Sequence, residues 1–207
     1  MTDDTKNAIM EATLAIVGES GFEKLTIRAI AERAGIGIGT VHYHFGSKDK
    51  AIAEAYRFVT SELRAAFSRL ADAAEDPEPS LRAFAESFSE AVHRHGAALA
   101  FFASRGGGIK DAPTEYREFA LGDGLGLAHA AMRRIDDTID EKEAAMRLSL
   151  FAGGLLYPEL VAGAMGTRMD DESERGRYGK LAAEILVPRA GAPTRILGKG
   201  ENHGSQA

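Results

Sequence analysis

Residues 39–48 place several groups that suit phosphate and base recognition within one short stretch. Thr40 offers a hydroxyl and a methyl group, Tyr43 and His44 offer polar atoms on rings, and Lys48 offers an ammonium group. Hydroxyls and ammonium groups bind phosphate oxygens, and a threonine can also meet a base edge in a groove. Gly39 has no side chain and lets the backbone approach a partner closely. The set therefore indicates non-covalent contacts to a nucleic acid.

Two short helices joined by a glycine-containing turn are needed to present these groups. Residues 25–50 predict such a pair, and Gly35 ends the first helix. Val41 and Phe45 lie one turn apart and pin the second helix to the core, which turns the glycine, threonine and tyrosine named above outward. This is the helix-turn-helix pattern, whose second helix fits a major groove about 12 Å wide.

The rest of the chain repeats apolar residues at helical spacing, and no run predicts a β-sheet. We therefore predict an all-α fold. A first helix ends near Gly21, and Ser47 caps a long helix over 48–71. The Pro-rich stretch 76–80 separates that helix from the remainder. The later helices are expected at 80–103, in shorter pieces within 109–135 broken by Pro113 and by Gly122, Gly124 and Gly126, from Asp140 to about Met165 with a kink before Pro158, and at 172–187.

The stretch around the turn closely resembles the TetR family of repressors over about residues 5–55. The matching residues are Phe22, Leu25, Thr26, Ile30, Ala31, Ala34, Gly35, Gly39, Thr40, Val41, Tyr43, His44, Phe45, Ser47 and Lys48. The resemblance implies an N-terminal three-helix helix-turn-helix DNA-binding domain at 1–50. It also implies a C-terminal helical ligand-binding and dimerisation domain at 51–187. Residues 188–207 are rich in glycine and polar residues and are expected to form a disordered tail.

The resemblance also implies a set of DNA-contacting residues, to which we add the turn residues and His42. The candidates are Thr26, Gly37, Ile38, Gly39, Thr40, His42, Tyr43, His44 and Lys48. Gly37 and Ile38 stand where the family usually has polar residues, so a cap and a phosphate contact are missing. Thr26 is either an N-cap alone or a DNA contact, and His42 is either a base contact or a solvated side chain.

The C-terminal helices carry a set of large apolar side chains that are candidates for lining a ligand pocket. They are Phe84, Phe88, Phe101, Phe102, Phe119, Met132, Phe151 and Tyr157. For most of these residues the alternative is an ordinary helical core, which is what a stripe at helical spacing more often forms. The last two long helices resemble the pair that forms the dimer in this family. The first of these two helices carries small residues at 152–154 and again at 162–164. Small side chains at these places would let the backbone of another helix approach closely.

Composition excludes several other classes of protein. The chain of 207 residues has no cysteine, and 44% of its residues are hydrophobic. We expect no disulfide, no metal site, no cofactor, no membrane span and a cytoplasmic location. His93 and His95 lie on different faces of a helix, and no phosphate-binding loop is present, so we do not expect an enzyme. The net charge of −6 is unusual for a DNA-binding protein, whose affinity depends on basic residues.

These observations predict a homodimeric DNA-binding repressor that a small, largely apolar ligand releases from a palindromic operator. An alternative is a small-molecule-binding or interaction protein whose DNA-binding module is weakened. The near-neutral segment 1–50 and the Gly37-Ile38 turn favour that alternative, whereas Tyr43 and Lys48 argue against it.

Overall fold

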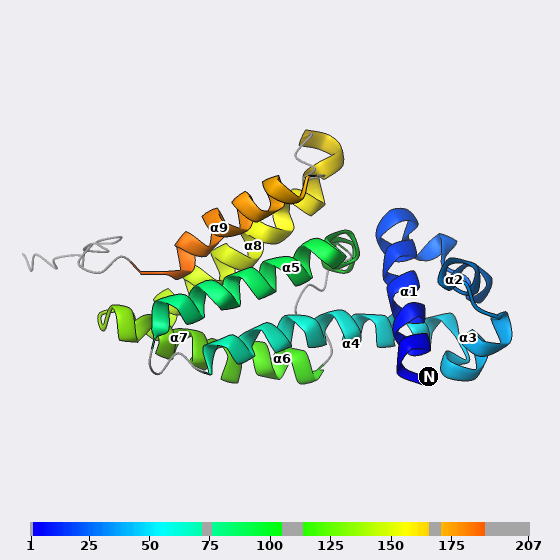
Figure 1. Cartoon of the computed structure of the whole chain (residues 1–207), viewed down its shortest axis with the longest axis horizontal. Coiled ribbons are helices and arrows are strands. Elements are labelled where there is room, and N and C mark those ends of the chain that lie inside the picture. Colours follow the sequence, from blue (N-terminus) through cyan, green and yellow to red (C-terminus); the bar gives the residue numbers. More distant parts are fainter. Residues whose placement is uncertain (1, 72–75, 105–113, 166–170, 189–207) are drawn as a thin grey trace, which may run out of the picture.

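The computed structural model describes residues 2–71, 76–104, 114–165 and 171–188. Within these ranges every regular element is helical and no strand occurs, which confirms the all-α prediction. The molecule is elongated, and helices α1 to α3 form one end of it (Figure 1). We call these three helices the N-terminal module and helices α5 to α9 the body. Among the described helices, none combines the length and the hydrophobicity of a membrane-spanning segment.

The N-terminal module consists of α1 (Thr2–Lys24), α2 (Ile27–Ala34) and α3 (Ile38–Phe45). The predicted end of the first helix near Gly21 is confirmed as a break, because Gly21 has a φ of 72° and a ψ of −178° inside α1. Gly35 ends α2 in the left-handed conformation with a φ of 67°. Both positive φ values favour glycine, since a Cβ atom is disfavoured there.

Helix α4 (Lys48–Ala66) leads from the module into the body (Figure 1). Ser47 caps it as predicted, and its hydroxyl accepts a hydrogen bond from the Lys50 amide at 3.3 Å. The sequence predicted one helix to residue 71, but the last turn tightens into the 3₁₀ helix η1 (Phe67–Leu70). Such tightening is common at helix ends and keeps Phe67 and Leu70 buried here.

The body contains α5 (Pro77–Ser104), α6 (Thr114–Leu121), α7 (Asp123–Ile135), α8 (Glu141–Met165) and α9 (Glu172–Leu186). The predicted start of the fifth helix was three residues late, because Pro77 occupies the first turn, where proline is tolerated. Gly122 separates α6 from α7, but the predicted breaks at Gly124 and Gly126 are wrong, since both lie inside α7. Helix α8 continues through Pro158. Gly106 to Gly108, Pro113 and residues 189–207 lie outside the described residues.

Helix α5 is the centre of the fold. It packs against α4, α7, α8 and α9, and also against α1 of the N-terminal module. The contact with α1 is close at Gly18, where a Cβ atom would lie 2.8 Å from the Cβ of Ala97 and 3.0 Å from the nitrogen of Ala98. The N-terminal module is therefore docked directly on the helix that organises the body.

Candidate nucleic-acid interface

Helix α3 is held to the N-terminal module by two side chains. Val41 is fully buried, and Phe45 is almost so. These two residues lie one turn apart, so the opposite side of the short helix must face outward. Helix α3 itself lies at the end of the molecule away from the body (Figure 1).

The structure places most of the predicted DNA-contacting residues on this outward surface. Tyr43 is 86% exposed and Ile38 is 46% exposed, although large apolar and aromatic side chains are more often buried. The other exposed members are Thr26, Gly37, Gly39, His42 and Lys48, whereas Thr40 and His44 are half-buried. The Tyr43 and His44 rings meet edge to face with centroids 5.3 Å apart. The candidates therefore lie on α3 and the turn before it, with Thr26 at the start of α2 and Lys48 at the start of α4.

Thr26 and Lys48 each have a structural partner within the chain. The Thr26 hydroxyl accepts a hydrogen bond from the Ala29 amide at 3.0 Å and caps α2. The Lys48 ammonium group donates to the carbonyl oxygen of Phe22 at 3.4 Å, which ties the start of α4 to the end of α1. Both residues remain exposed. The fold alone therefore explains why these two residues are where they are. A contact to DNA would be a second role for each of them.

The turn before α3 lacks a polar cap. Gly37 is the N-cap residue of α3, and no side chain accepts a hydrogen bond from the first amides of this helix. Free amides at a helix N-terminus suit an anion such as a phosphate. The amides of Thr40 and Val41 donate to the Gly37 carbonyl oxygen, at 3.0 and 3.4 Å. The missing side-chain cap therefore leaves the amides of Ile38 and Gly39 for a partner.

Basic side chains on the module are partly neutralised. Arg33 of α2 forms an ion pair with Glu19 of α1. The hydrogen bond from Arg33 lowers the pKa of the Glu19 carboxyl group below its usual range. Arg28 of α2 is exposed, and so are Lys48 and Lys50 in the first turn of α4, next to the module. A nucleic acid bound here would therefore contact a few individual basic side chains and not a broad basic surface.

The predicted pocket residues of the body divide into two clusters. In the first, the rings of Phe84, Phe88 and Phe151 lie 5.5 to 5.9 Å apart. Phe67 joins them to Phe119 with centroid distances of 4.7 Å to Phe84 and 5.2 Å to Phe119. We call these five rings the body cluster. Phe67 was not among the predicted pocket residues, because helical periodicity does not show which side chains of other helices it meets.

The second cluster lies between the module and the body. Phe22 of α1 meets Phe101 edge to face at 4.8 Å, and Tyr56 of α4 stacks on Phe102 at 4.3 Å. The remaining two pocket candidates lie elsewhere. Met132 is fully buried in the core, whereas Tyr157 is exposed on α8. The structure thus does not bring all eight predicted pocket residues together.

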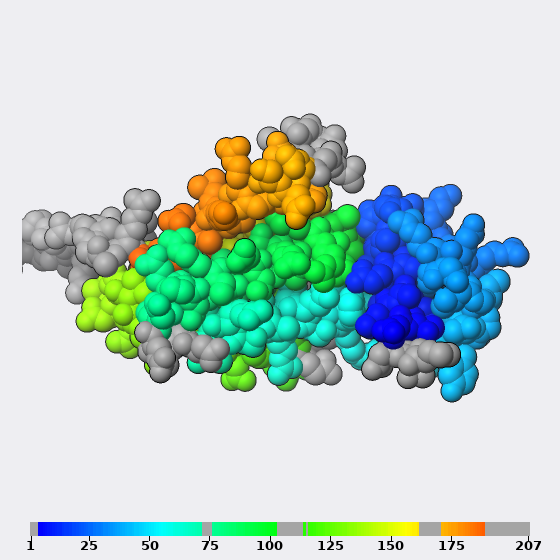
Figure 2. Space-filling model, viewed as in Figure 1, coloured from blue at the N-terminus to red at the C-terminus, as the bar shows by residue number. Residues whose placement is uncertain are grey.

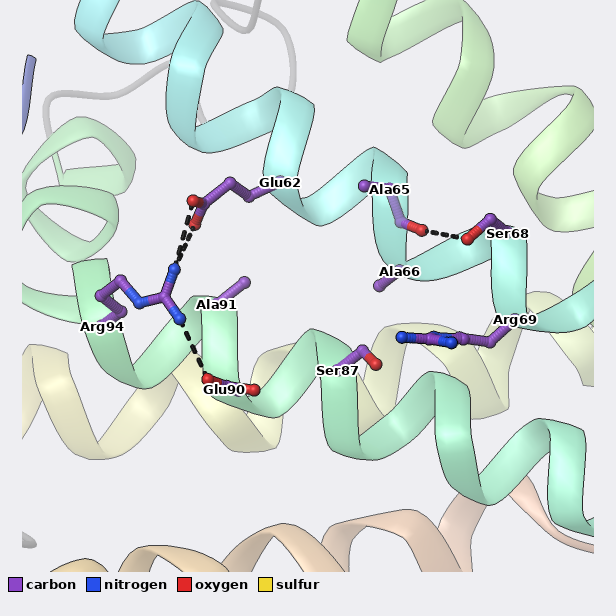
Figure 3. A pocket seen from close by; sticks show the side chains of 9 residues that line it. All are labelled: Glu62, Ala65, Ala66, Ser68, Arg69, Ser87, Glu90, Ala91 and Arg94. Carbon is purple, nitrogen blue, oxygen red and sulfur yellow. Dashed lines mark hydrogen bonds and ion pairs between the residues drawn. The ribbon is translucent and has the colours of Figure 1, made fainter. Parts of the chain in front are cut away.

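A polar groove of about 300 Å³ runs between α4, η1 and α5 (Figure 3). Its lining includes Glu62 and Arg69 on one side and Ser87, Glu90 and Arg94 on the other. Arg94 bridges the two sides, because it contacts Glu62 at 3.2 Å and Glu90 at 3.0 Å. Figure 3 shows the Arg69 side chain extended across the groove toward Ser87. This groove is charged, in contrast to the apolar pocket that the sequence predicts.

Comparison with known proteins connects the N-terminal module to one family. Residues 9–55 match the family model described as bacterial regulatory proteins, tetR family. The chain is similar to the HTH-type transcriptional regulator BetI of Stenotrophomonas maltophilia, with 33% identity over 95 residues, which are 45% of this chain and 48% of that protein. It is also similar to BetI of Burkholderia mallei, with 36% identity over 84 residues, 40% of this chain and 43% of that protein. The matches span about half the length of these relatives.

Solved structures are similar over most of the fold. The TetR family transcriptional regulator PfmR of Thermus thermophilus has a TM-score of 0.62 at 21% identity, covering 86% of this chain and 96% of that one. A TetR family transcription regulator of Marinobacter aquaeolei has a TM-score of 0.60 at 16% identity, covering 90% and 98%. At identities this low the similarity concerns the fold alone. It extends over the body as well as the N-terminal module.

Proposed function

Because residues 9–55 match the family model of the tetR family of bacterial regulatory proteins, we propose that the chain is a transcriptional regulator of this family that binds operator DNA as a homodimer. The observation that supports this most is the outward edge of α3, where Tyr43 is exposed while Val41 and Phe45 are buried. A helix held in this way can enter the major groove. We further propose that the protein is a repressor and that its operator is palindromic.

Each part of the outward edge has a proposed role on the duplex. Tyr43, His44 and Lys48 bind phosphates, and the free amides at the start of α3 add a further phosphate contact. Thr40 and Ile38 meet base edges, where a methyl group of thymine can accept an apolar contact. His42 is exposed beside them. Because the module has few available cations, the sequence-independent part of the affinity should be small.

Gly39 offers a test that separates a functional from a structural role. A Cβ atom at Gly39 would meet nothing within 4 Å, so packing within the protomer does not require glycine. We expect Gly39→Ala to raise the free energy of unfolding by about 0.5–1 kcal/mol and yet to weaken operator binding. Urea unfolding and fluorescence anisotropy measure the two effects.

The matched control for this variant is Gly126→Ala in α7. A Cβ atom at Gly126 also meets nothing within 4 Å, and this glycine is also helical. The control should gain similar stability and keep full operator affinity. Unchanged affinity in Gly39→Ala would argue against close approach of α3 to the duplex.

Dimerisation is proposed through α8 and α9, which pack on each other along the upper edge of the molecule in Figure 1. Figure 2 shows the orange atoms of α9 at that surface. Exposed apolar side chains recur on one face of α8 at Met146, Leu150, Tyr157 and Leu160, and Leu181 adds to them from α9. Gly153 lies in the same stripe, exposed, with no atom within 4 Å of a Cβ position. An apolar stripe of this length rarely stays in water, so a second copy of the chain is its proposed cover. The second predicted stretch of small residues, 162–164, lies outside the residues whose side chains the structure describes.

The proposed effector is a small, largely apolar molecule that binds the body. The body cluster supports this choice, because its five aromatic rings come from α5, α6, α8 and η1 and form a contiguous apolar group. The rings pack on one another, so the effector has to open the cluster. It acts only if it binds the form that does not fit the operator more tightly than the form that does.

One experiment tests the proposal that the protein binds DNA with sequence preference. The full chain is incubated with random double-stranded oligonucleotides, and bound sequences are enriched over several rounds. We expect an inverted repeat whose half-sites lie about one helical turn, or about 34 Å, apart. Enrichment of no motif by folded, dimeric protein would contradict the proposal and favour a small-molecule-binding protein with a weakened module.

A further inference from the structure

Three ionisable side chains from different helices meet where the N-terminal module touches the body. They are Glu11 of α1, Glu62 of α4 and His95 of α5, and one ligand atom from each lies within 4.8 Å of the others. We call them the junction cluster. The sequence showed no metal-ligand motif, because these residues lie far apart along the chain.

The His95 ring is held between the two carboxylates. Its Nε2 atom lies 3.1 Å from Oε2 of Glu62, which is a hydrogen-bond distance. Its Nδ1 atom lies 3.8 Å from Oε2 of Glu11, which is too long for a hydrogen bond. Two ligands of one tetrahedral zinc ion, each bonded at about 2.1 Å, are about 3.4 Å apart. The second distance therefore fits a shared ion after a small rotation of Glu11.

Burial and access also suit a bound ion. The His95 side chain is only 2% exposed, whereas Glu11 is 46% exposed and Glu62 is 24% exposed. The Phe58 ring meets the imidazole edge to face with centroids 6.0 Å apart and adds an apolar wall. The buried histidine is thus held in one orientation, and the half-exposed Glu11 carboxylate opens the cluster to solvent on one side.

The local charge favours a divalent cation. Glu11 and Glu62 face the imidazole, and Arg94 links Glu62 to Glu90 on the outer side. Three carboxylates and one guanidinium group leave an excess of two negative charges. A mixed imidazole and carboxylate set is typical of zinc and similar transition metals and not of calcium or magnesium.

We propose that the junction cluster binds a divalent transition-metal ion of the zinc class. Nδ1 of His95 and the Glu11 carboxylate bind the ion directly. Nε2–H of His95 donates to Glu62, and a carboxylate in this place commonly orients a metal-binding histidine. The ion joins α1 of the module to α5 of the body and fixes one orientation of the module. An effect of the ion on operator affinity follows only if the proposed function holds.

A titration of the full chain with zinc in the absence of DNA tests the site, and calorimetry measures the binding. We expect one saturable zinc ion per chain. Glu11→Gln and Glu62→Gln should each weaken binding at least about tenfold, because even outer partners of a metal site commonly contribute tenfold to 100-fold. Thermal unfolding should shift upward with zinc in the wild type and not in Glu11→Gln. Glu11 is half-exposed, so its amide variant should fold normally.

Glu86→Gln on the exposed face of α5 is the control and should bind zinc as the wild type does. Absence of saturable binding, or equal affinity in Glu11→Gln and the wild type, would overturn the proposal. The latter result would place the zinc elsewhere, for example on the exposed His42. These measurements need no DNA, so they remain decisive even if operator binding fails. If operator binding holds, zinc should change the operator affinity of the wild type and leave that of Glu11→Gln unchanged.

Discussion

Replacing Tyr43 by alanine is expected to weaken operator binding at least about 30-fold, if each contact contributes about 1 kcal/mol and the dimer makes it twice. Tyr43 is 86% exposed, so the variant should lose little stability, within about 0.5 kcal/mol. Fluorescence anisotropy with the selected operator measures the affinity, and urea unfolding measures the stability. A loss of affinity without a loss of stability assigns the side chain to the interface and not to the core.

Two further variants sharpen this test. Tyr43→Phe removes only the hydroxyl group and should lose the phosphate hydrogen bond while keeping the ring. Leu121→Ala truncates another exposed side chain, 62% exposed on α6, and should bind the operator as the wild type does. Wild-type affinity in Tyr43→Ala would show that the outward edge of α3 does not meet the duplex in the proposed way.

Replacing Leu150 by aspartate is expected to separate the dimer into folded monomers. Leu150 is 63% exposed in the protomer and lies in the middle of the apolar stripe on α8. An unpaired charge buried in an interface costs about 3 kcal/mol or more, which raises the dissociation constant of the dimer at least about 100-fold. Sedimentation equilibrium measures this constant. Operator affinity should fall as well, because two linked modules bind with a high effective concentration.

The matched control is Leu121→Asp, which introduces the same charge at an equally exposed apolar position away from α8 and α9. It should remain dimeric. If Leu150→Asp also remains a dimer at all concentrations, then the stripe on α8 is not the interface.

The N-terminal module could be predicted from sequence because its signals are local. The Thr26 cap, the left-handed glycine at position 35 and the pair Val41 and Phe45 each act within one or two helical turns. The break at Gly21 is local too, since only its own backbone has to take a positive φ. Such features are encoded in neighbouring residues and need no knowledge of the rest of the fold.

The arrangement of the body could not be predicted in the same detail. Helical periodicity shows which side of a helix is buried but not which helix covers it. Phe101 and Phe102 therefore looked like partners of Phe84, whereas they pack against Phe22 and Tyr56 at the module. The junction cluster was invisible for the same reason, because only the packing of α1, α4 and α5 brings its members together.

The central claim is that the outward edge of α3 reads a DNA sequence. The most direct measurement compares the affinity of the dimer for the selected operator with its affinity for a scrambled duplex of equal length at about 0.1 M salt. Specific DNA-binding proteins prefer their sites by about 10³-fold or more, and we predict a ratio in that range. A ratio near one, measured on folded dimeric protein, would contradict the claim.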